Sequence, residues 1–333
     1  MKNAARPCRV LSLSLVIATL MFAGLGKAQE PSTAKKASLI EETPISLTSR
    51  MVTLGISVTD KQGRPISGLR PEDFEIIEDK TPQKIELFAT EDSPLTIAIA
   101  IDRSGSMMIN HKLERALEAV TMFLNQSNPD DEFLLGVFNQ RLNVVQDFAP
   151  GPKPALEAVK RCEAPDGGTS LYDSIFELVD RINHFNTEHH KAIVLLTDGD
   201  DRSSTHTIEQ TIKYASQGDV QIYTIGIFGD DYSATARGFL KKISDDSGGR
   251  SYFPAKEKEM PKIWSEIAGE LRHQYGIAYS PSNNRWDGNW RNINVKVKKQ
   301  DGMPKIKLHT RRGYFASIPG SERGPVVKNE NKQ

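Results

Sequence analysis

The chain has 333 residues, of which 38% are hydrophobic and 26% charged, with 18 prolines, 24 glycines and two cysteines. These proportions exclude a collagen, a disordered tail protein, a multi-pass membrane protein and a cysteine-rich metal or redox site. Basic and acidic residues balance at 43 each, so no strong overall field would attract nucleic acid as a partner.

The first 28 residues have the pattern of a secretory signal peptide. Basic residues and no acidic ones lie in the first nine positions, an apolar run follows from 10 to 25, and small residues precede Gln29. We expect cleavage after Ala28, export to the periplasm or the extracellular space, and no stable membrane anchor afterwards. The alternative is an uncleaved anchor, because the apolar run is close to the shortest length that spans a bilayer. Residues 29–49 are polar and aperiodic, which predicts a flexible leader.

Residues 50–93 predict a small N-terminal β block. Apolar and polar residues alternate from Val52 to Thr59, which is the period of a half-buried strand. Further short strands are expected at Phe74–Glu78 and Lys84–Phe88, with turn and loop residues before them.

Residues 94–274 predict an α/β domain with a doubly wound, mostly parallel, Rossmann-like sheet. Short, nearly continuous apolar runs indicate strands that are covered on both faces, at Leu95–Ile101, Phe133–Phe138, Ala192–Leu196 and Val220–Ile227. Apolar residues at helical spacing indicate helices around Leu113–Leu124, Leu171–Ile182 and Ile263–Leu271. This alternation implies right-handed crossovers. We expect Asp130 and Asp131 to be solvated loop acids.

Residues 275–316 return to β character and predict a C-terminal β block. Tyr275–Tyr279 predicts one strand, and alternation near residues 293–298 and 305–308 predicts two more. We expect this block to pair with the N-terminal β block in one sandwich-like unit, into which the α/β domain is inserted. The basic residues of this region favour a solvated strand face, because no aromatic residues interleave with them. Residues 317–333 predict a disordered tail.

Three polar segments lie at junctions between predicted strands and helices. These junctions are at the carboxyl edge of the sheet, where parallel sheets bind ligands. Asp102, Ser104 and Ser106 form a D-x-S-x-S loop after the first strand of the α/β domain, Thr169 precedes a helix, and Asp198 follows another strand. We expect these side chains to converge, because the carboxyl ends of the strands meet at one edge. Each segment alone would also suit a helix cap or a turn. Their joint occurrence favours a shared cation site.

Such a site would hold a hard cation, because carboxylates and hydroxyls are all oxygen donors. They suit Mg²⁺, with Mn²⁺ or Ca²⁺ as alternatives, rather than Zn²⁺. The positive N-terminal end of the following helix opposes a cation, so the two aspartates must outweigh it. A coordination position that faces solvent could accept a carboxylate from a partner.

The segments D-R-S-G-S, G-G-T-S and L-T-D-G-D resemble the metal-ion-dependent adhesion site (MIDAS) of the von Willebrand factor type A (VWA) domain. The resemblance implies that Asp102, Ser104 and Ser106 bind the metal. It also implies that Thr169 binds directly or through water, according to state, and that Asp198 acts through water. The flanking segments R-P-E-D-F-E-I-I-E-D and R-R-G-Y-F-A are similar to bacterial secreted proteins called VWFA-related, so that the resemblance covers about residues 45–316.

These features predict a secreted, non-catalytic protein-binding module that uses a divalent ion to coordinate Asp or Glu of a partner protein. One alternative is an enzyme of Mg²⁺-dependent phosphoryl transfer. Against it, the sequence has no phosphate-binding loop, dinucleotide fingerprint or nucleophile elbow, and no base is evident beside Ser104 or Ser106. The other alternative is a structural envelope subunit with an unused metal site.

Overall fold

The computed structural model describes residues 51–90, 94–162, 167–187, 189–228, 233–298 and 302–316. The predicted signal peptide (1–28), leader (29–49) and tail (317–333) lie outside the described residues. Within these described ranges, no helix has the length and hydropathy that a membrane span requires.

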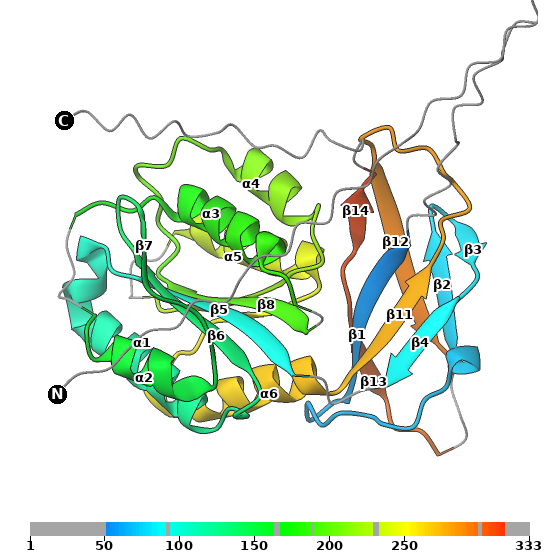
Figure 1. The fold of residues 1–333 in the computed structure, drawn as a ribbon, viewed down its shortest axis with the longest axis horizontal. Helices are drawn as coiled ribbons and strands as arrows, with labels where there is room; N and C mark the ends of the chain where they lie inside the picture. Colours follow the sequence, from blue (N-terminus) through cyan, green and yellow to red (C-terminus); the bar gives the residue numbers. More distant parts are fainter. Residues whose placement is uncertain are drawn as a thin grey trace, which may run out of the picture. The chain divides into compact units, whose positions relative to one another are not determined.

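A six-stranded sheet forms the centre of the α/β domain, in the order β10-β9-β8-β5-β6-β7 (Figure 1). Its strands are β5 (Leu95–Asp102), β6 (Glu132–Phe138), β7 (Leu142–Pro150), β8 (His190–Thr197), β9 (Gln221–Gly226) and β10 (Ser251–Tyr252). All neighbours are parallel except β7, which pairs antiparallel with β6. Every residue of β5 is buried, as expected for a central strand that is covered on both faces. The predicted doubly wound, mostly parallel sheet is confirmed.

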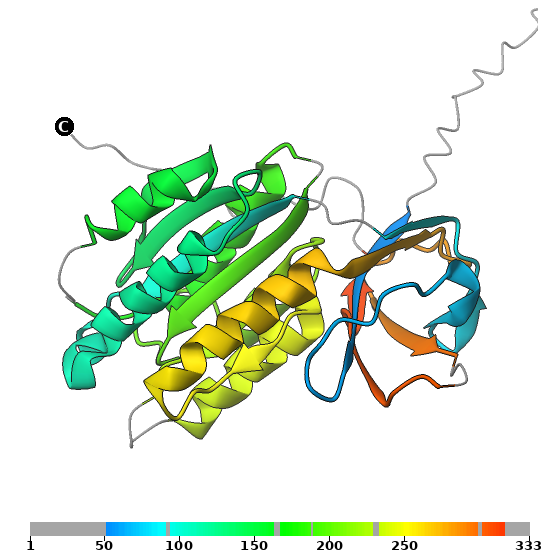
Figure 2. The same ribbon diagram turned by 90° about the horizontal axis from the view of Figure 1, so that it is seen from below.

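Helices cover both faces of this sheet (Figures 1 and 2). They are α1 (Lys112–Asn125), α2 (Pro152–Val159), α3 (Leu171–His184), α4 (Ile208–Ala215), α5 (Ala234–Ser247) and α6 (Met260–Arg272), with short 3₁₀ helices at Pro71–Asp73, Gly105–His111 and Glu257–Glu259. One apolar cluster joins the sheet to α1, α2 and α6, and a second joins it to α3, α4 and α5. In the first cluster Trp264 stacks on Phe123, with 4.5 Å between ring centroids, so that α6 is fixed against α1.

Two antiparallel four-stranded sheets form a separate β sandwich, in the orders β13-β1-β11-β4 and β14-β12-β2-β3. Their strands are β1 (Val52–Asp60), β2 (Phe74–Glu78), β3 (Thr81–Gln83), β4 (Leu87–Thr90), β11 (Gln274–Tyr279), β12 (Trp290–Val297), β13 (Ile306–His309) and β14 (Gly313–Phe315). Each sheet combines strands from before and after the α/β domain, and one apolar cluster joins the two sheets. The strands that flank the α/β domain therefore form one sandwich-like unit, as expected.

Two details differ from the sequence expectations. The strand expected at Lys84–Phe88 begins only at Leu87, the first residue of β4, because residues 84–86 connect β3, which ends at Gln83, to β4. Asp131 is not a solvated acid: its side chain is 1% exposed and accepts a hydrogen bond from Arg272 Nη2 at 2.5 Å. It also accepts the backbone N–H of Leu95 at 3.1 Å. Arg272 supplies a positive charge and Leu95 supplies the N–H group at the start of a strand. Both residues are distant from Asp131 in sequence, and together they explain why this loop acid is buried.

His309, at the end of β13, should make the stability of the protein depend on pH. Burial lowers the pKa of His309 to about 4, and the charge of Arg250 adds to this shift. The folded state then binds a proton less readily than the unfolded state, so stability is lost as pH falls below 6.5. We expect His309 to lower the free energy of unfolding by about 2 kcal/mol between pH 7 and pH 5. Urea titrations at pH 7 and pH 5 should show this loss for the protein and no comparable loss for His309→Gln, and parallel pH profiles of the two proteins would contradict the prediction.

Candidate metal centre

Asp102 joins the ends of two neighbouring parallel strands. It is the last residue of β5, and its side chain is completely buried. Its Oδ1 atom accepts the backbone N–H of Ser104 at 2.8 Å, and its Oδ2 atom accepts the hydroxyl of Thr197, the last residue of β8, at 2.6 Å. Since the Thr197 hydroxyl itself accepts the N–H of Gly199 at 2.9 Å, its own hydrogen is directed to Asp102. The sheet edge is thus organised around one carboxylate.

The two predicted serine ligands lie beside each other in the loop after β5. Ser104 Oγ and Ser106 Oγ are 3.0 Å apart, and Ser104 is buried whereas Ser106 is partly exposed. The serine hydroxyls and the Asp102 carboxylate therefore belong to one tight loop, with Ser106 towards solvent.

Backbone hydrogen bonds connect this loop to the other two predicted segments. The N–H of Gly105 donates to the carbonyl of Gly167 at 3.1 Å. Two residues later, the carbonyl of the buried Thr169 accepts the N–H groups of Arg202 and Ser203, which follow Asp198, at 2.9 and 3.0 Å. All three segments therefore belong to one connected set of loops at the same edge of the sheet.

Asp198 follows β8 directly and pairs with a residue that the sequence analysis did not single out. Its Oδ2 atom accepts a hydrogen bond from Lys112 Nζ at 3.0 Å, and the two side chains are 6% and 8% exposed. The other oxygen, Oδ1, is buried and has no hydrogen-bond partner among the residues that the structure describes. A buried carboxylate oxygen requires a partner, and a cation or one of its waters would provide it. Gly199, with φ of 80°, turns the chain away immediately afterwards.

The electrostatics of the centre favour a positive ligand. Burial raises the pKa of Asp102 to about 6, and the negative charge of Asp198 adds to this effect, whereas hydrogen bonds from Ser104 and Thr197 oppose it. In the described ranges, no three His, Cys, Asp or Glu residues are grouped as a metal site. A cation here would therefore depend on hydroxyl and water oxygens besides the two carboxylates, which fits a hard ion such as Mg²⁺.

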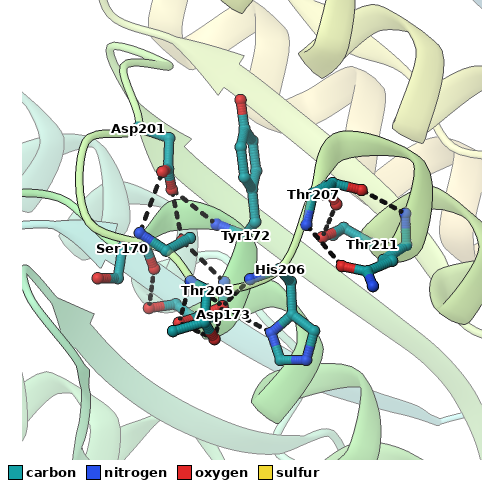
Figure 3. Close-up of polar contacts among 11 residues, drawn as sticks. Ser170, Tyr172, Asp173, Asp201, Thr205, His206, Thr207 and Thr211 are labelled. Carbon is teal, nitrogen blue, oxygen red and sulfur yellow. Dashed lines mark hydrogen bonds and ion pairs between the residues drawn. The ribbon is translucent and has the colours of Figure 1, made fainter.

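A second layer of hydrogen bonds fixes the loop after Asp198 (Figure 3). Asp173, in the first turn of α3, accepts the N–H groups of Thr205 and His206, both at 2.9 Å, and His206 Nδ1 at 2.6 Å. Asp201 accepts the N–H of Tyr172, the second residue of α3, at 3.2 Å. The N-terminus of α3 therefore holds the loop whose backbone contacts Thr169.

The structure thus places every predicted site residue in this connected set of loops. Asp102 and the two serines share direct hydrogen-bonded contacts, whereas Thr169 and Asp198 are connected to them through backbone groups, Thr197 and Gly199. Their role as metal ligands stays a prediction. Lys112 was missed, although a lysine at the start of a predicted helix, where acidic residues are preferred, is a detectable signal.

Comparisons with known proteins point to one domain family. Residues 97–200 match the family model of the von Willebrand factor type A domain. Human inter-alpha-trypsin inhibitor heavy chain H4 is 26% identical over 236 residues, which are 66% of this chain and 25% of that protein. The chain thus spans a quarter of the length of this relative.

Two solved structures are also similar to the chain. A von Willebrand factor type A protein from Catenulispora acidiphila is 16% identical, with a TM-score of 0.48, and the match covers 80% of this chain and 75% of that one. Proximal thread matrix protein 1 from the mussel byssus, with a zinc-occupied MIDAS motif, is 17% identical, with a TM-score of 0.48 and coverage of 59% and 50%.

Proposed function

We propose, because residues 97–200 match the von Willebrand factor type A domain, that the protein is an exported adhesion module that binds an acidic residue of a partner protein through a divalent ion. One observation carries the proposal. Two buried carboxylates, Asp102 and Asp198, lie at the ends of the neighbouring strands β5 and β8, and the Oδ1 atom of Asp198 has no hydrogen-bond partner within the described part of the chain.

The proposed ligands supply oxygen from three segments of the chain. Asp102, Ser104 and Ser106 bind the ion directly, Thr169 binds it directly or through water, and Asp198 binds through water. Mg²⁺ suits this set best, with Mn²⁺ or Ca²⁺ as alternatives, because it accepts few carboxylates and retains waters. Neutral hydroxyls leave the ion with a high affinity for one more carboxylate, and the partner provides it.

The surface next to the proposed ligands suits a protein rather than a small anion. Met108 and Ile109, two and three residues after Ser106, are 65% and 60% exposed. An adjacent pair of large exposed apolar side chains favours contact with another protein. A partner with an acidic residue beside apolar residues would use both features.

Capture of a partner tests this function. We expect crosslinking capture from an envelope extract to enrich a protein in Mg²⁺ and to lose it, at least about tenfold, in chelator or with Asp102→Ala. Asp147→Ala is the matched control, because Asp147 is a 62% exposed acid on β7 that has no part in the proposed site. Equal capture in Mg²⁺ and chelator, or by the Asp102 variant, would contradict metal-dependent binding.

A further inference from the structure

Lys112 brings a positive charge into the metal centre from the start of α1. It is the first residue of that helix, where the helix dipole disfavours a cation. Its side chain is almost fully buried, and a buried ammonium group is costly unless it is paired. Both costs are offset by one hydrogen bond, from Lys112 Nζ to Asp198 Oδ2 at 3.0 Å. A lysine at this position does not stabilise α1 itself, so we attribute its presence to its contact with Asp198 in the metal centre.

The two oxygen atoms of the Asp198 carboxylate have different surroundings. Lys112 holds Oδ2, whereas Oδ1 is buried and has no hydrogen-bond partner in the ranges that the structure describes. One oxygen is therefore paired with a cation that belongs to the chain, and the other remains free for an exchangeable ion or its water. With Lys112 included, the two aspartates and the lysine carry one net negative charge instead of two.

We propose that Lys112 is an internal counter-ion of the metal centre, which stabilises the metal-free site through Asp198 and lowers the affinity of the site for a divalent cation. This inference rests on the proposed function, which supplies the ion. A lysine charge close to a divalent ion repels it, and at an effective dielectric constant of about 20 this repulsion changes the dissociation constant at least about tenfold. Lys112 thereby keeps the site folded when the ion leaves and makes exchange of the ion easier.

Metal binding by Lys112→Met and Lys112→Gln tests the counter-ion. Mg²⁺ is the probe, with calorimetric titration and thermal unfolding in chelator and in Mg²⁺ as readouts. We expect both variants to melt at lower temperature than the unchanged protein in chelator, and to bind Mg²⁺ at least about tenfold more tightly. Lys112→Gln keeps a hydrogen-bond donor without the charge, so tighter binding in both variants identifies the charge as the cause. If Lys112→Met folds only when Mg²⁺ is added, that metal-dependent folding supports the proposal as well.

Lys242→Met is the matched control. Lys242 pairs with the 8% exposed carboxylate of Asp246 at 2.6 Å on α5, and neither residue contacts a proposed metal ligand. We expect this variant to bind Mg²⁺ with unchanged affinity.

Two outcomes would overturn the inference in distinguishable ways. If the unchanged protein binds Mg²⁺, Asp102→Ala does not, and both Lys112 variants bind with unchanged or lower affinity, then Lys112 is only a structural ion pair and the proposed function survives. If the unchanged protein and Asp102→Ala both fail to bind Mg²⁺, Mn²⁺ or Ca²⁺, the proposed function and the counter-ion fail together.

Discussion

Replacing Asp102 with asparagine should abolish the stabilisation of this protein by Mg²⁺ and, in chelator, make the protein more stable at neutral pH. Burial raises the pKa of Asp102 from 3.8 to about 6, and the charge of Asp198 contributes to the rise. Keeping that carboxylate ionised at pH 7 therefore costs up to about 3 kcal/mol of folding free energy when no cation compensates it. Asparagine has the same shape, carries no charge and still accepts the Ser104 N–H through its Oδ1 atom. Its Nδ2 group cannot accept the Thr197 hydroxyl, so the gain in stability should be smaller than this cost by about 1 kcal/mol.

The prediction is checked by urea unfolding at neutral pH, in chelator and in excess Mg²⁺. The unchanged protein should gain stability in Mg²⁺ according to its affinity for the ion, whereas Asp102→Asn should give the same midpoint in both solutions. Asp147→Asn, which neutralises an exposed acid on β7, serves as the control and should retain the response to Mg²⁺. An undiminished Mg²⁺ effect in Asp102→Asn would remove this residue from the metal site.

The elements that could be predicted from the sequence are those whose burial leaves a simple pattern. β5 lies between two parallel neighbours and under helices on both faces. Its only charged residue is therefore the terminal aspartate, and the rest forms an apolar run that only Thr96 interrupts. α3 buries one face over fourteen residues, which is long enough for the helical period to be visible.

The elements that were missed lack such a pattern for physical reasons. β7 is the antiparallel edge strand, and most of its residues are only partly buried, so its sequence neither alternates cleanly nor forms an apolar run. α2 and α4 have eight residues each, about two turns, which is too short for periodicity to stand out. α5 (Ala234–Ser247) was also missed although it has 14 residues, because its buried face includes Ser244, Asp246 and Ser247 and so forms no clear apolar stripe. For α4 a local signal was available, because Thr207 and Gln210 form a capping box.

The site was predictable to the extent that its residues occupy ends of buried strands. Asp102 and Asp198 were located because a charge directly after an apolar run must lie at a sheet edge. The partners that position them come from tertiary contacts: Thr197 bonds to Asp102 across 95 positions, and Lys112 to Asp198 across 86. No short sequence window contains both members of either pair, so their pairing required the three-dimensional fold.

Asp131 should be among the most sensitive positions of the chain, with Asp131→Ala lowering the free energy of unfolding by about 3–5 kcal/mol. Its buried carboxylate accepts the guanidinium of Arg272 at 2.5 Å and the N–H of Leu95 at 3.1 Å. It also accepts the N–H of Asn128 at 3.1 Å. Removal of the carboxylate leaves these three donors without their acceptor, in a region with little access to water. Urea unfolding gives the size of the loss.

The positions of Leu95 and Arg272 predict that Asp131→Ala also increases local opening near these two residues. Leu95 begins β5, where the chain enters the α/β domain, and Arg272 ends α6, directly before β11 returns to the sandwich. Asp131→Ala should therefore speed amide hydrogen exchange at the start of β5 and the end of α6 more than in β9, which makes none of these contacts. Asp131→Asn keeps an acceptor for Leu95 but loses the charge that pairs with Arg272, so its cost should be smaller, about 1–3 kcal/mol. Two results would contradict this role of Asp131. Either both variants would lose less than about 1 kcal/mol of unfolding free energy, or amide exchange would rise equally in β9. Asp131 would then not connect the start of β5 to the end of α6, the two places where the chain passes between the sandwich and the α/β domain.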